Sequence, residues 1–307
     1  MMPHSITSLF SFISIILAVA FFTLFERKGL SYIQNRKGPN KVGLLGLPQP
    51  LMDATKLLTK EMTKLSLINQ IPYFLAPALS FSLALIMWQL YPLSSMTQPM
   101  KWGALLFLTV SSMNVYGTLL AGWASNSKYA LLGALRAIAQ TISYEVTLAL
   151  ILLFALFSTQ TLNLMEIKMF SNLTFIALLF MPISLVWLIA CIAETNRAPF
   201  DFAEGESELV SGFNIEYGAS GFALIFLAEY ANILLMSMLT TSIFFGASKL
   251  MMINENIYLM KILGLTFFFI WARATLPRFR YDLLMNLTWK HILPLALSVL
   301  SLIIMLY

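Results

Sequence analysis

Six carboxylates are crowded into one short segment of the sequence, between residues 194 and 216. The acids are Glu194, Asp201, Glu204, Glu206, Glu208 and Glu216, and the only cation among them is Arg197. Crowded carboxylates repel one another, so they titrate as a coupled set in which some members bind a proton near neutral pH. This segment, the acidic loop, therefore predicts the uptake and transfer of protons.

The acidic loop has a simpler interpretation as a solvated connection without chemistry. Against that interpretation, the acids alternate with side chains that favour burial, such as Phe200, Phe202 and Phe213. We therefore expect the loop to be partly buried and functional.

Two further acids lie within long apolar stretches, where a charged side chain costs on the order of 3 kcal/mol in a bilayer. Glu145 borders a polar stripe whose members repeat at steps of four, namely Arg136, Gln140 and Tyr144. Glu229 has no basic neighbour in the sequence, so its partner comes from another helix or it is neutral. Each acid is either a structural contact between helices or a proton carrier, and we favour the second for Glu145.

Redox chemistry on this chain alone is excluded by its composition. The sequence contains one cysteine and two histidines, too few for an iron–sulfur cluster or a haem held by paired histidines. It also has no glycine-rich nucleotide motif. We predict no metal site here, and any electron carrier must belong to a partner.

The elements that position these acids must be membrane helices. Of 307 residues, 59% are hydrophobic and only 11% are charged, whereas a soluble domain has roughly 25% charged residues. We predict one polytopic all-α domain over residues 1–307 with about eight transmembrane helices. They are Ile6–Phe25, Tyr73–Tyr91, Trp102–Trp123, Ala130–Phe157, Leu173–Ala193, Gly218–Phe245, Ile257–Leu276 and Leu287–Leu306.

The basic residues set the expected orientation. Fifteen of the 19 lysines and arginines lie in or beside the odd-numbered connections, which therefore face the cytoplasm or its equivalent. Both termini are then on the opposite side. The net charge of +5 reflects this topology, and we expect no nucleic-acid partner. Residues 1–25 have no Lys, Arg, Asp or Glu, so we expect a retained first span rather than a cleaved leader.

The first connection contains a basic amphipathic segment at about residues 50–62, where apolar and charged side chains repeat at helical spacing. Such a helix lies flat at the membrane interface. It is either a peripheral anchor or one wall of an opening at lipid level. Charges from the first, fifth and seventh connections could together enclose a polar mouth for a ligand with an apolar tail.

Four segments resemble one protein family, the chain 1 family of NADH–ubiquinone oxidoreductase, a core membrane subunit of respiratory complex I. They are Glu26–Lys28 with Arg36–Asn40, Gly133–Glu145, Glu194–Tyr217 and Pro277–Asp282. The resemblance covers essentially the whole chain, and roughly twenty consecutive positions of the third segment agree.

The resemblance implies that the chain forms much of a ubiquinone tunnel in the mitochondrial inner membrane, with its termini on the intermembrane-space side. The matching tunnel residues are Arg27, Arg36, Asp53, Arg197, Phe226 and Arg273. The matching residues of a proton path are Glu145, Glu194, Asp201, Glu204, Glu206 and Glu229.

The resemblance also implies partners. Ubiquinone is the substrate, and FMN and iron–sulfur clusters are expected on peripheral-arm subunits, while protons pass to antiporter-like membrane subunits and membrane lipid surrounds the chain. Three alternatives remain: a related subunit of a membrane-bound hydrogenase, a stand-alone ion channel or transporter, and a scaffold without an active role.

Overall fold

The computed structural model describes residues 4–62, 66–92, 100–171, 177, 180–205, 210–246 and 253–306. Within these ranges the regular secondary structure is entirely helical, which confirms the predicted fold class. The α-helices are α1 (His4–Ile33), α2 (Gln49–Thr59), α3 (Gln70–Met87), α4 (Gly103–Ala124), α5 (Lys128–Thr159), α6 (Leu164–Ser171), α8 (Met181–Glu194), α10 (Ala219–Thr240), α11 (Ile253–Thr275), α12 (Tyr281–Asn286) and α13 (Leu293–Leu306). The shorter turns are η1 (Trp88–Leu90) and η2 (Gly212–Asn214), both 3-10, and η3 (Thr241–Phe245) and η4 (Leu287–Ile292), both π-helical.

Seven helical segments of the described chain are long and apolar enough to cross a membrane, and they match seven of the eight predicted spans. They are Ser8–Ile33, Gln70–Leu90, Gly103–Ala124, Lys128–Thr159, Ala219–Phe245, Glu255–Thr275 and Tyr281–Met305. The predicted fifth span corresponds to α8, a shorter apolar helix of 14 residues. Residues 172–176 and 178–179 of that prediction lie outside the described residues.

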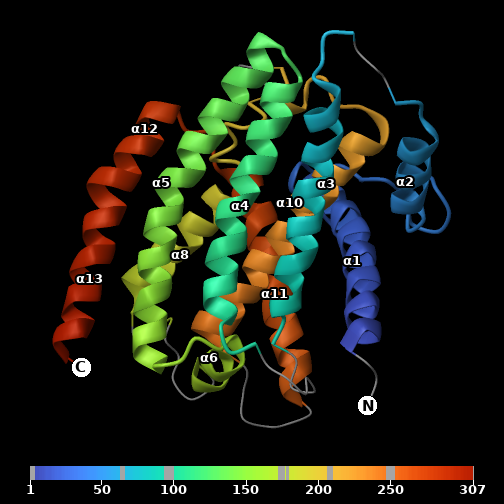
Figure 1. Ribbon diagram of the computed structural model, residues 1–307. Coiled ribbons are helices and arrows are strands. Elements are labelled where there is room, and N and C mark those ends of the chain that lie inside the picture. Colours follow the sequence, from blue (N-terminus) through green and yellow to red (C-terminus); the bar gives the residue numbers. More distant parts are fainter. Residues whose placement is uncertain are drawn as a thin grey trace.

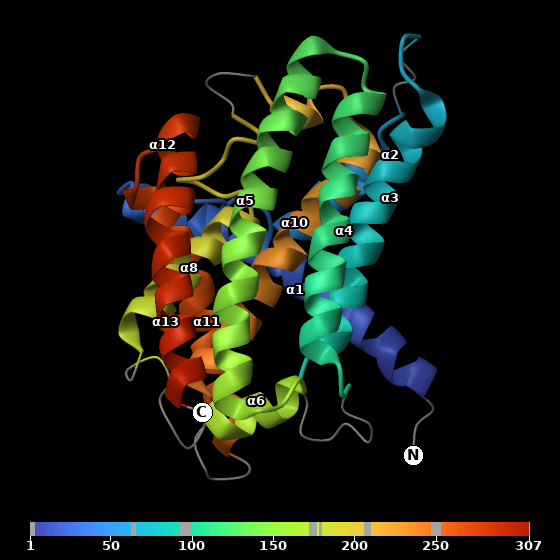
Figure 2. The same ribbon diagram turned by 60° about the vertical axis from the view of Figure 1, so that its left-hand side comes forward.

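The helices form an elongated bundle with two distinct ends (Figure 1). One end, which we call the loop end, has the acidic loop, α12 and the laterally placed α2. The other, the α6 end, has α6, the start of α1 and the end of α13. In the turned view α13 packs against α5 and α3 packs against α4 (Figure 2). The start of α1 and the end of α13 thus lie at the same end of the bundle, opposite the acidic loop.

Helices α5 and α10 are the central members of the bundle. In each, 56% of the most apolar window is buried, against 22% for the span in α1 and for Tyr281–Met305. Leucine and phenylalanine side chains that face outward on the peripheral helices suit contact with lipid. Several polar side chains of α5 and α10, among them Gln140, Tyr144 and Ser237, are instead buried, so these two helices position the candidate chemistry.

Two glycines allow the acidic loop to lie directly on α5. A Cβ atom at Gly133 would come within 2.9 Å of the Cα atom of Gly212. Gly212 itself has a φ of +55° and approaches the carbonyl oxygen of Ala203 too closely for any side chain. The absence of side chains at both positions brings the backbone of η2 against the helix.

The α6 end contains a buried cation that the sequence did not lead us to expect. Lys168 is only 3% exposed, and its Nζ donates to the Pro92 carbonyl oxygen at 3.0 Å and to Glu255 at 3.2 Å. The same ammonium lies 4.1 Å from the ring centroid of Tyr258. Ser171 adds a hydrogen bond of 2.9 Å to the Ser242 carbonyl oxygen in η3. Helix α6 is therefore joined by polar contacts to α11 and to η3, the π-helical turn that follows α10.

Candidate functional site

The acidic loop begins with a tight turn at the end of α8. Asn196 has a φ of +49°, its N–H donates to the Ala193 carbonyl at 3.2 Å, and the N–H of Arg197 donates to Ile192 at 3.4 Å. This is the pattern of a Schellman motif, in which a left-handed residue ends a helix and satisfies its last carbonyls. The motif points the side chains of Glu194 and Arg197 in fixed but different directions.

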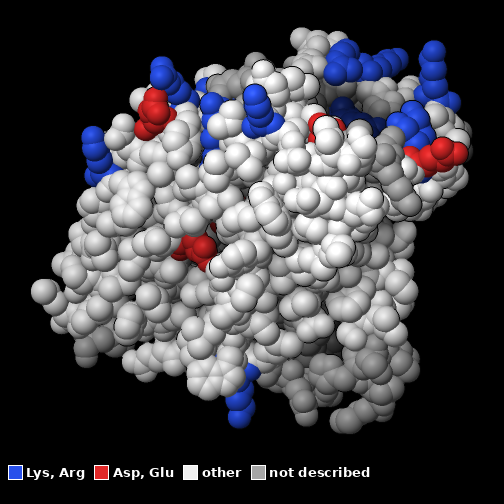
Figure 3. Space-filling view, turned by 45° about the horizontal axis from the view of Figure 1, so that its top comes forward, with Lys and Arg blue, Asp and Glu red and all other residues white. Residues whose placement is uncertain are grey.

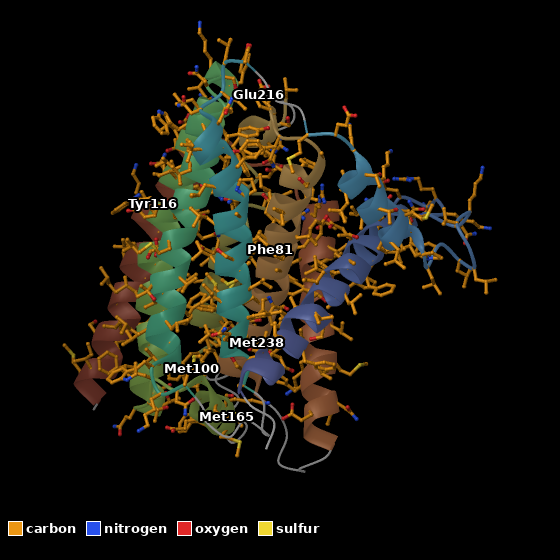
Figure 4. All side chains as sticks on the ribbon, turned by 45° about the vertical axis from the view of Figure 1, so that its right-hand side comes forward. Phe81, Met100, Tyr116, Met165, Glu216 and Met238 are labelled. Carbon is orange, nitrogen blue, oxygen red and sulfur yellow. The ribbon has the colours of Figure 1, made fainter. Side chains whose placement is uncertain are left out.

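The other end of the loop is held by a pair of tyrosines. The rings of Tyr73 and Tyr217 are stacked with centroids 4.3 Å apart and planes 6° apart. The Tyr73 hydroxyl donates to the Glu216 carbonyl oxygen at 2.6 Å, and the Tyr217 hydroxyl donates to the Tyr73 carbonyl at 3.2 Å. Figure 4 shows Glu216 at the loop end and Met100 and Met165 at the opposite end.

Arg197 reaches away from the acidic loop to a carboxylate on α1. Its Nη1 donates to Glu26 Oε1 at 3.2 Å, and Arg273 of α11 donates to the same oxygen. The Arg197 guanidinium also lies 4.4 Å from the ring centroid of Tyr230. Burial lowers the pKa of Arg197, but the neighbouring Glu26 carboxylate, together with Tyr230 and Glu229, outweighs burial and raises the pKa above its usual value. Both guanidiniums are charged, so this cluster of one acid and two bases has a net positive charge.

Glu26 is the centre of this cluster and was not among the predicted site residues. It is 5% exposed, near the end of α1, and its two arginine partners come from the acidic loop and from the last turn of α11. A clue existed in the sequence, since an acid that directly follows a span and precedes Arg27 and Lys28 is at membrane level. Its distant partners gave no local signal.

A row of aromatic rings leads along α10 to the same cluster. The rings of Phe222 and Phe226 are 4.3 Å apart between centroids, and those of Phe226 and Tyr230 are 6.2 Å apart. Phe22 of α1 meets Tyr230 edge-on at 5.7 Å. The structure therefore brings three predicted tunnel residues, Arg197, Arg273 and Phe226, to one region between α1, α10 and α11.

The remaining predicted tunnel residues are Arg27 in the last part of α1, Asp53 in α2, and Arg36 on the connection between these helices. Arg27 Nη1 lies 2.5 Å from Asp53 Oδ2, and Gln49 donates to the other Asp53 oxygen at 2.9 Å. This pair ties the end of α1 to α2, next to Glu26 in the sequence. Arg36 is exposed and donates to Gln34 at 2.9 Å. The structure does not bring Arg36 into the buried cluster.

A polar cavity of about 40 Å³ lies among α3, α4, α8 and α10. At roughly 10–15 Å³ for each water molecule, it has room for about three or four. Its lining includes Glu194 and Glu229 together with Asn114 and Asn232. Within the described chain, Glu194 Oε2 and Asn232 Oδ1 are buried and make no hydrogen bond, and water in the cavity would satisfy both atoms. Sequence reasoning missed the two asparagines, since neither is charged.

The other acids lie around this cavity at different depths. Glu145 on α5 is half-buried and close enough to Glu194 to interact electrostatically. Glu229 interacts in the same way with Glu204 and Asp201 from the acidic loop, and also with Arg197. Glu206, the remaining residue of the predicted proton path, lies outside the described residues.

The described part of the acidic loop is docked rather than solvated. Asp201 is 3.0 Å from Arg278, and the Phe279 N–H donates to the Pro199 carbonyl oxygen at 3.1 Å. Asn214 Nδ2 donates to Glu204 Oε1 at 3.4 Å. These contacts come from within the loop and from the connection before α12, which confirms that the loop is partly buried.

The surface charge agrees with this arrangement. Lysine and arginine side chains gather around the loop end, and an acid is visible in a hollow of the uncharged flank (Figure 3). In the described part of the chain, no group of three or more histidine, cysteine, aspartate or glutamate side chains is arranged to hold a metal ion. The site thus consists of a positive cluster, an aromatic row and an acid-lined cavity, with Arg197 interacting on both sides.

Comparisons with known proteins agree with the resemblance of the motifs. Residues 6–305 match the family model described as NADH dehydrogenase. The chain belongs to this family. It is 51% identical over 304 residues to NADH-ubiquinone oxidoreductase chain 1 of Heterololigo bleekeri, covering 99% of this chain and 97% of that one. It is 53% identical over 293 residues to the protein of the same name from Aedes aegypti, covering 95% of this chain and 92% of that one.

Proposed function

We propose that this chain is a core membrane subunit of a proton-translocating NADH–ubiquinone oxidoreductase. In this proposal it forms part of the passage that holds ubiquinone, and it connects quinone reduction to a buried path of carboxylates. The observation that carries the proposal is the position of Arg197, which pairs with Glu26 in the positive cluster and also interacts with Glu229 of the cavity.

The aromatic row and the positive cluster suit the two parts of a quinone. An isoprenoid tail is apolar and fits between α1 and α10, beside Phe226 and Phe222. The headgroup has two carbonyl oxygens, which accept hydrogen bonds from guanidinium donors. Arg197 and Arg273 together have more positive charge than Glu26 neutralises, so they would stabilise negative charge that develops on a reduced headgroup.

The carboxylates supply a route for protons. Reduction of a quinone to a quinol consumes two electrons and two protons, so charge near Arg197 changes during turnover. Glu229 would respond first because it interacts with Arg197, followed by Glu194 across the cavity and then Glu145. Asp201 and Glu204 extend the set into the acidic loop, and Glu206 belongs to the same proposed path.

The redox groups belong to other subunits in this proposal. FMN and iron–sulfur clusters are on peripheral-arm partners that dock at the loop end, where basic side chains gather. The antiporter-like membrane partners receive protons from Glu145. The complex is in the mitochondrial inner membrane, with the α6 end toward the intermembrane space, and the interfacial helix α2 contacts lipid. Arg27, Asp53 and Arg36 then flank the opening of the passage near α2.

The acid path is tested by comparing quinone reduction with proton pumping in the assembled complex. Glu204→Gln and Glu145→Gln each keep the side-chain shape but cannot carry a proton. We expect fewer protons pumped for each NADH oxidised, measured with a pH-sensitive dye in sealed vesicles. Wild-type rates of both reactions in both variants would contradict the proposal. Photo-crosslinking of a quinone analogue to this chain, next to Arg273 or Phe226, tests the passage separately.

A further inference from the structure

Gln140 is a fully buried amide on the central helix α5, and its contacts lie far away in the sequence. Its Nε2 donates to the Ala193 carbonyl oxygen at 2.9 Å and to the Phe200 carbonyl oxygen at 2.8 Å. A side-chain amide nitrogen has two hydrogens, so both donors of Gln140 are used. One side chain therefore binds the last turn of α8 and the acidic loop simultaneously.

The segment between these two carbonyls contains the residues with the largest roles in the proposed function. Glu194 follows Ala193 directly and lines the polar cavity. Arg197 is midway and pairs with Glu26 on α1. The Glu194 side chain lines the cavity, and the Arg197 side chain pairs with Glu26 on α1. Both residues belong to the segment of seven peptide units whose two ends are hydrogen-bonded to Gln140.

Other contacts of this segment do not tie it to α5 through hydrogen bonds, since the Pro199 carbonyl accepts from the Phe279 N–H and Arg197 pairs with Glu26 on α1. The Schellman turn constrains residues 192 to 197 relative to one another, but not relative to α5. The ring of Phe200 lies 5.9 Å from that of Tyr144 and 5.5 Å from that of Phe279, and such apolar contacts tolerate sliding. Two directional hydrogen bonds to carbonyl oxygens set both position and rotation.

We propose that Gln140 is a positioning residue that holds Glu194 in the cavity and Arg197 against Glu26 as one rigid unit. This inference rests on the proposed function for its catalytic consequence, but not for its structural part. If Gln140 loosens, both side chains shift together. Quinone binding and proton pumping should then be impaired jointly, although Gln140 is not among the residues that line the cavity.

The test uses Gln140→Met, which keeps the size of the side chain and removes both donors, in the assembled complex. Loss of both hydrogen bonds loosens Arg197, and we expect a roughly tenfold rise in KM for a short-chain quinone, which corresponds to about 1.4 kcal/mol. Fewer protons are pumped for each NADH oxidised. The matched control is Thr141→Val on the same helix, because the Thr141 hydroxyl bonds only to its own helix, at 3.1 Å and 3.0 Å. We expect the control to behave as wild type.

Cys191 gives a direct readout of position. It is the single cysteine of the chain, it is fully buried, and it lies one turn before Glu194. In Gln140→Met, a membrane-permeant maleimide should label Cys191 several times faster than in wild type, as measured by mass spectrometry of this chain. Assembled Gln140→Met with wild-type KM, pumping ratio and labelling would overturn the inference. So would a variant that differs only in the amount of complex.

Two further variants distinguish a failure of this inference from a failure of the proposed function. Arg197→Met should raise mainly the KM, and Glu194→Gln should lower mainly the pumping ratio. If neither variant changes its quantity as expected, the proposed function is contradicted. The positioning role of Gln140 is then tested by the rate of Cys191 labelling alone. If Gln140→Met does not assemble, Gln140→Glu replaces it, since a protonated acid keeps one donor. Intermediate values then support the inference, and wild-type values refute it.

Discussion

Replacement of Glu26 by glutamine should destabilise the protein far more than the same replacement at Asp53. Both acids pair with arginine, but Glu26 and Arg197 have side chains only 6% and 13% exposed, against 34% and 53% for Asp53 and Arg27. Removal of one partner from a buried pair costs about 3–5 kcal/mol, because the other charge stays buried without compensation. An exposed pair is worth about 0–1 kcal/mol.

The structure places the cost of Glu26→Gln at the lower end of the range of about 3–5 kcal/mol for a buried pair. Glutamine keeps one acceptor oxygen for the arginines. Because Arg273 is 39% exposed, water screens its charge, and loss of the Arg273–Glu26 pair adds less than about 1 kcal/mol to the cost. We expect a loss of roughly 3 kcal/mol for Glu26→Gln, which corresponds to a fall in transition temperature on the order of 5 °C. Asp53→Asn should lower it by about 1 °C or less.

The assay heats the purified complex in steps and measures the fraction of NADH–quinone reductase activity that remains, relative to each unheated variant. Normalisation removes any direct effect on turnover. Equal shifts for the two variants would show that burial does not decide the strength of these pairs. No shift for Glu26→Gln would show that the Glu26 cluster does not contribute to stability.

Three more substitutions test other parts of the structure. Gly133→Ala should cost about 1–3 kcal/mol and reduce quinone reductase activity, because its methyl group would displace the acidic loop from α5. Gly264→Ala is the control, with nothing within 4 Å of its Cβ, and equal behaviour of the two would refute the close approach. Lys168→Met should lower the transition temperature without raising the KM for quinone, because it leaves Glu255 unpaired at the α6 end. A changed KM would argue against a purely structural role. Tyr73→Phe should cost about 1 kcal/mol through loss of a hydroxyl bond to the loop, measured by the same heating assay, and an unchanged transition temperature would contradict it.

The spans were predictable because a bilayer imposes a simple rule on length and polarity. That rule correctly identified α1, α3 and α4 from uncharged runs, and α5 and α10 from long apolar runs that contain only one or two charged residues. It could not identify α6, which has eight residues and contains Lys168. A short helix at the membrane boundary is stabilised by tertiary contacts, and these leave no periodic signal in the sequence.

The candidate site was predictable only in part. Unusual residues such as Glu145 and Glu229 stand out because their location is costly, whatever their partners. Glu26 does not stand out, since its partners Arg197 and Arg273 are 171 and 247 residues away. The contacts of neutral amides were harder still to predict. Gln140 was visible as part of a polar stripe, but nothing in the sequence indicated that its targets are two backbone carbonyls, one in the last turn of α8 and one in the acidic loop.

The acidic loop is also less uniform than its composition implied. As a sequence it looked like one coupled group of six carboxylates. In the structure Asp201 pairs with Arg278, whereas Glu194 faces the cavity on the other side of the Schellman turn. The backbone separates neighbouring acids into different surroundings, and only coordinates reveal that separation.

The buried pair at the α6 end has a consequence for the order in which the chain assembles in the membrane. Lys168 precedes Glu255 by 87 residues, so its ammonium is synthesised well before its partner exists. An unpaired ammonium is costly to bury and stays in water until a counter-charge arrives. Helix α6 therefore takes its final place only after α11 has been inserted, and closure of the bundle at this end is a late event of biogenesis.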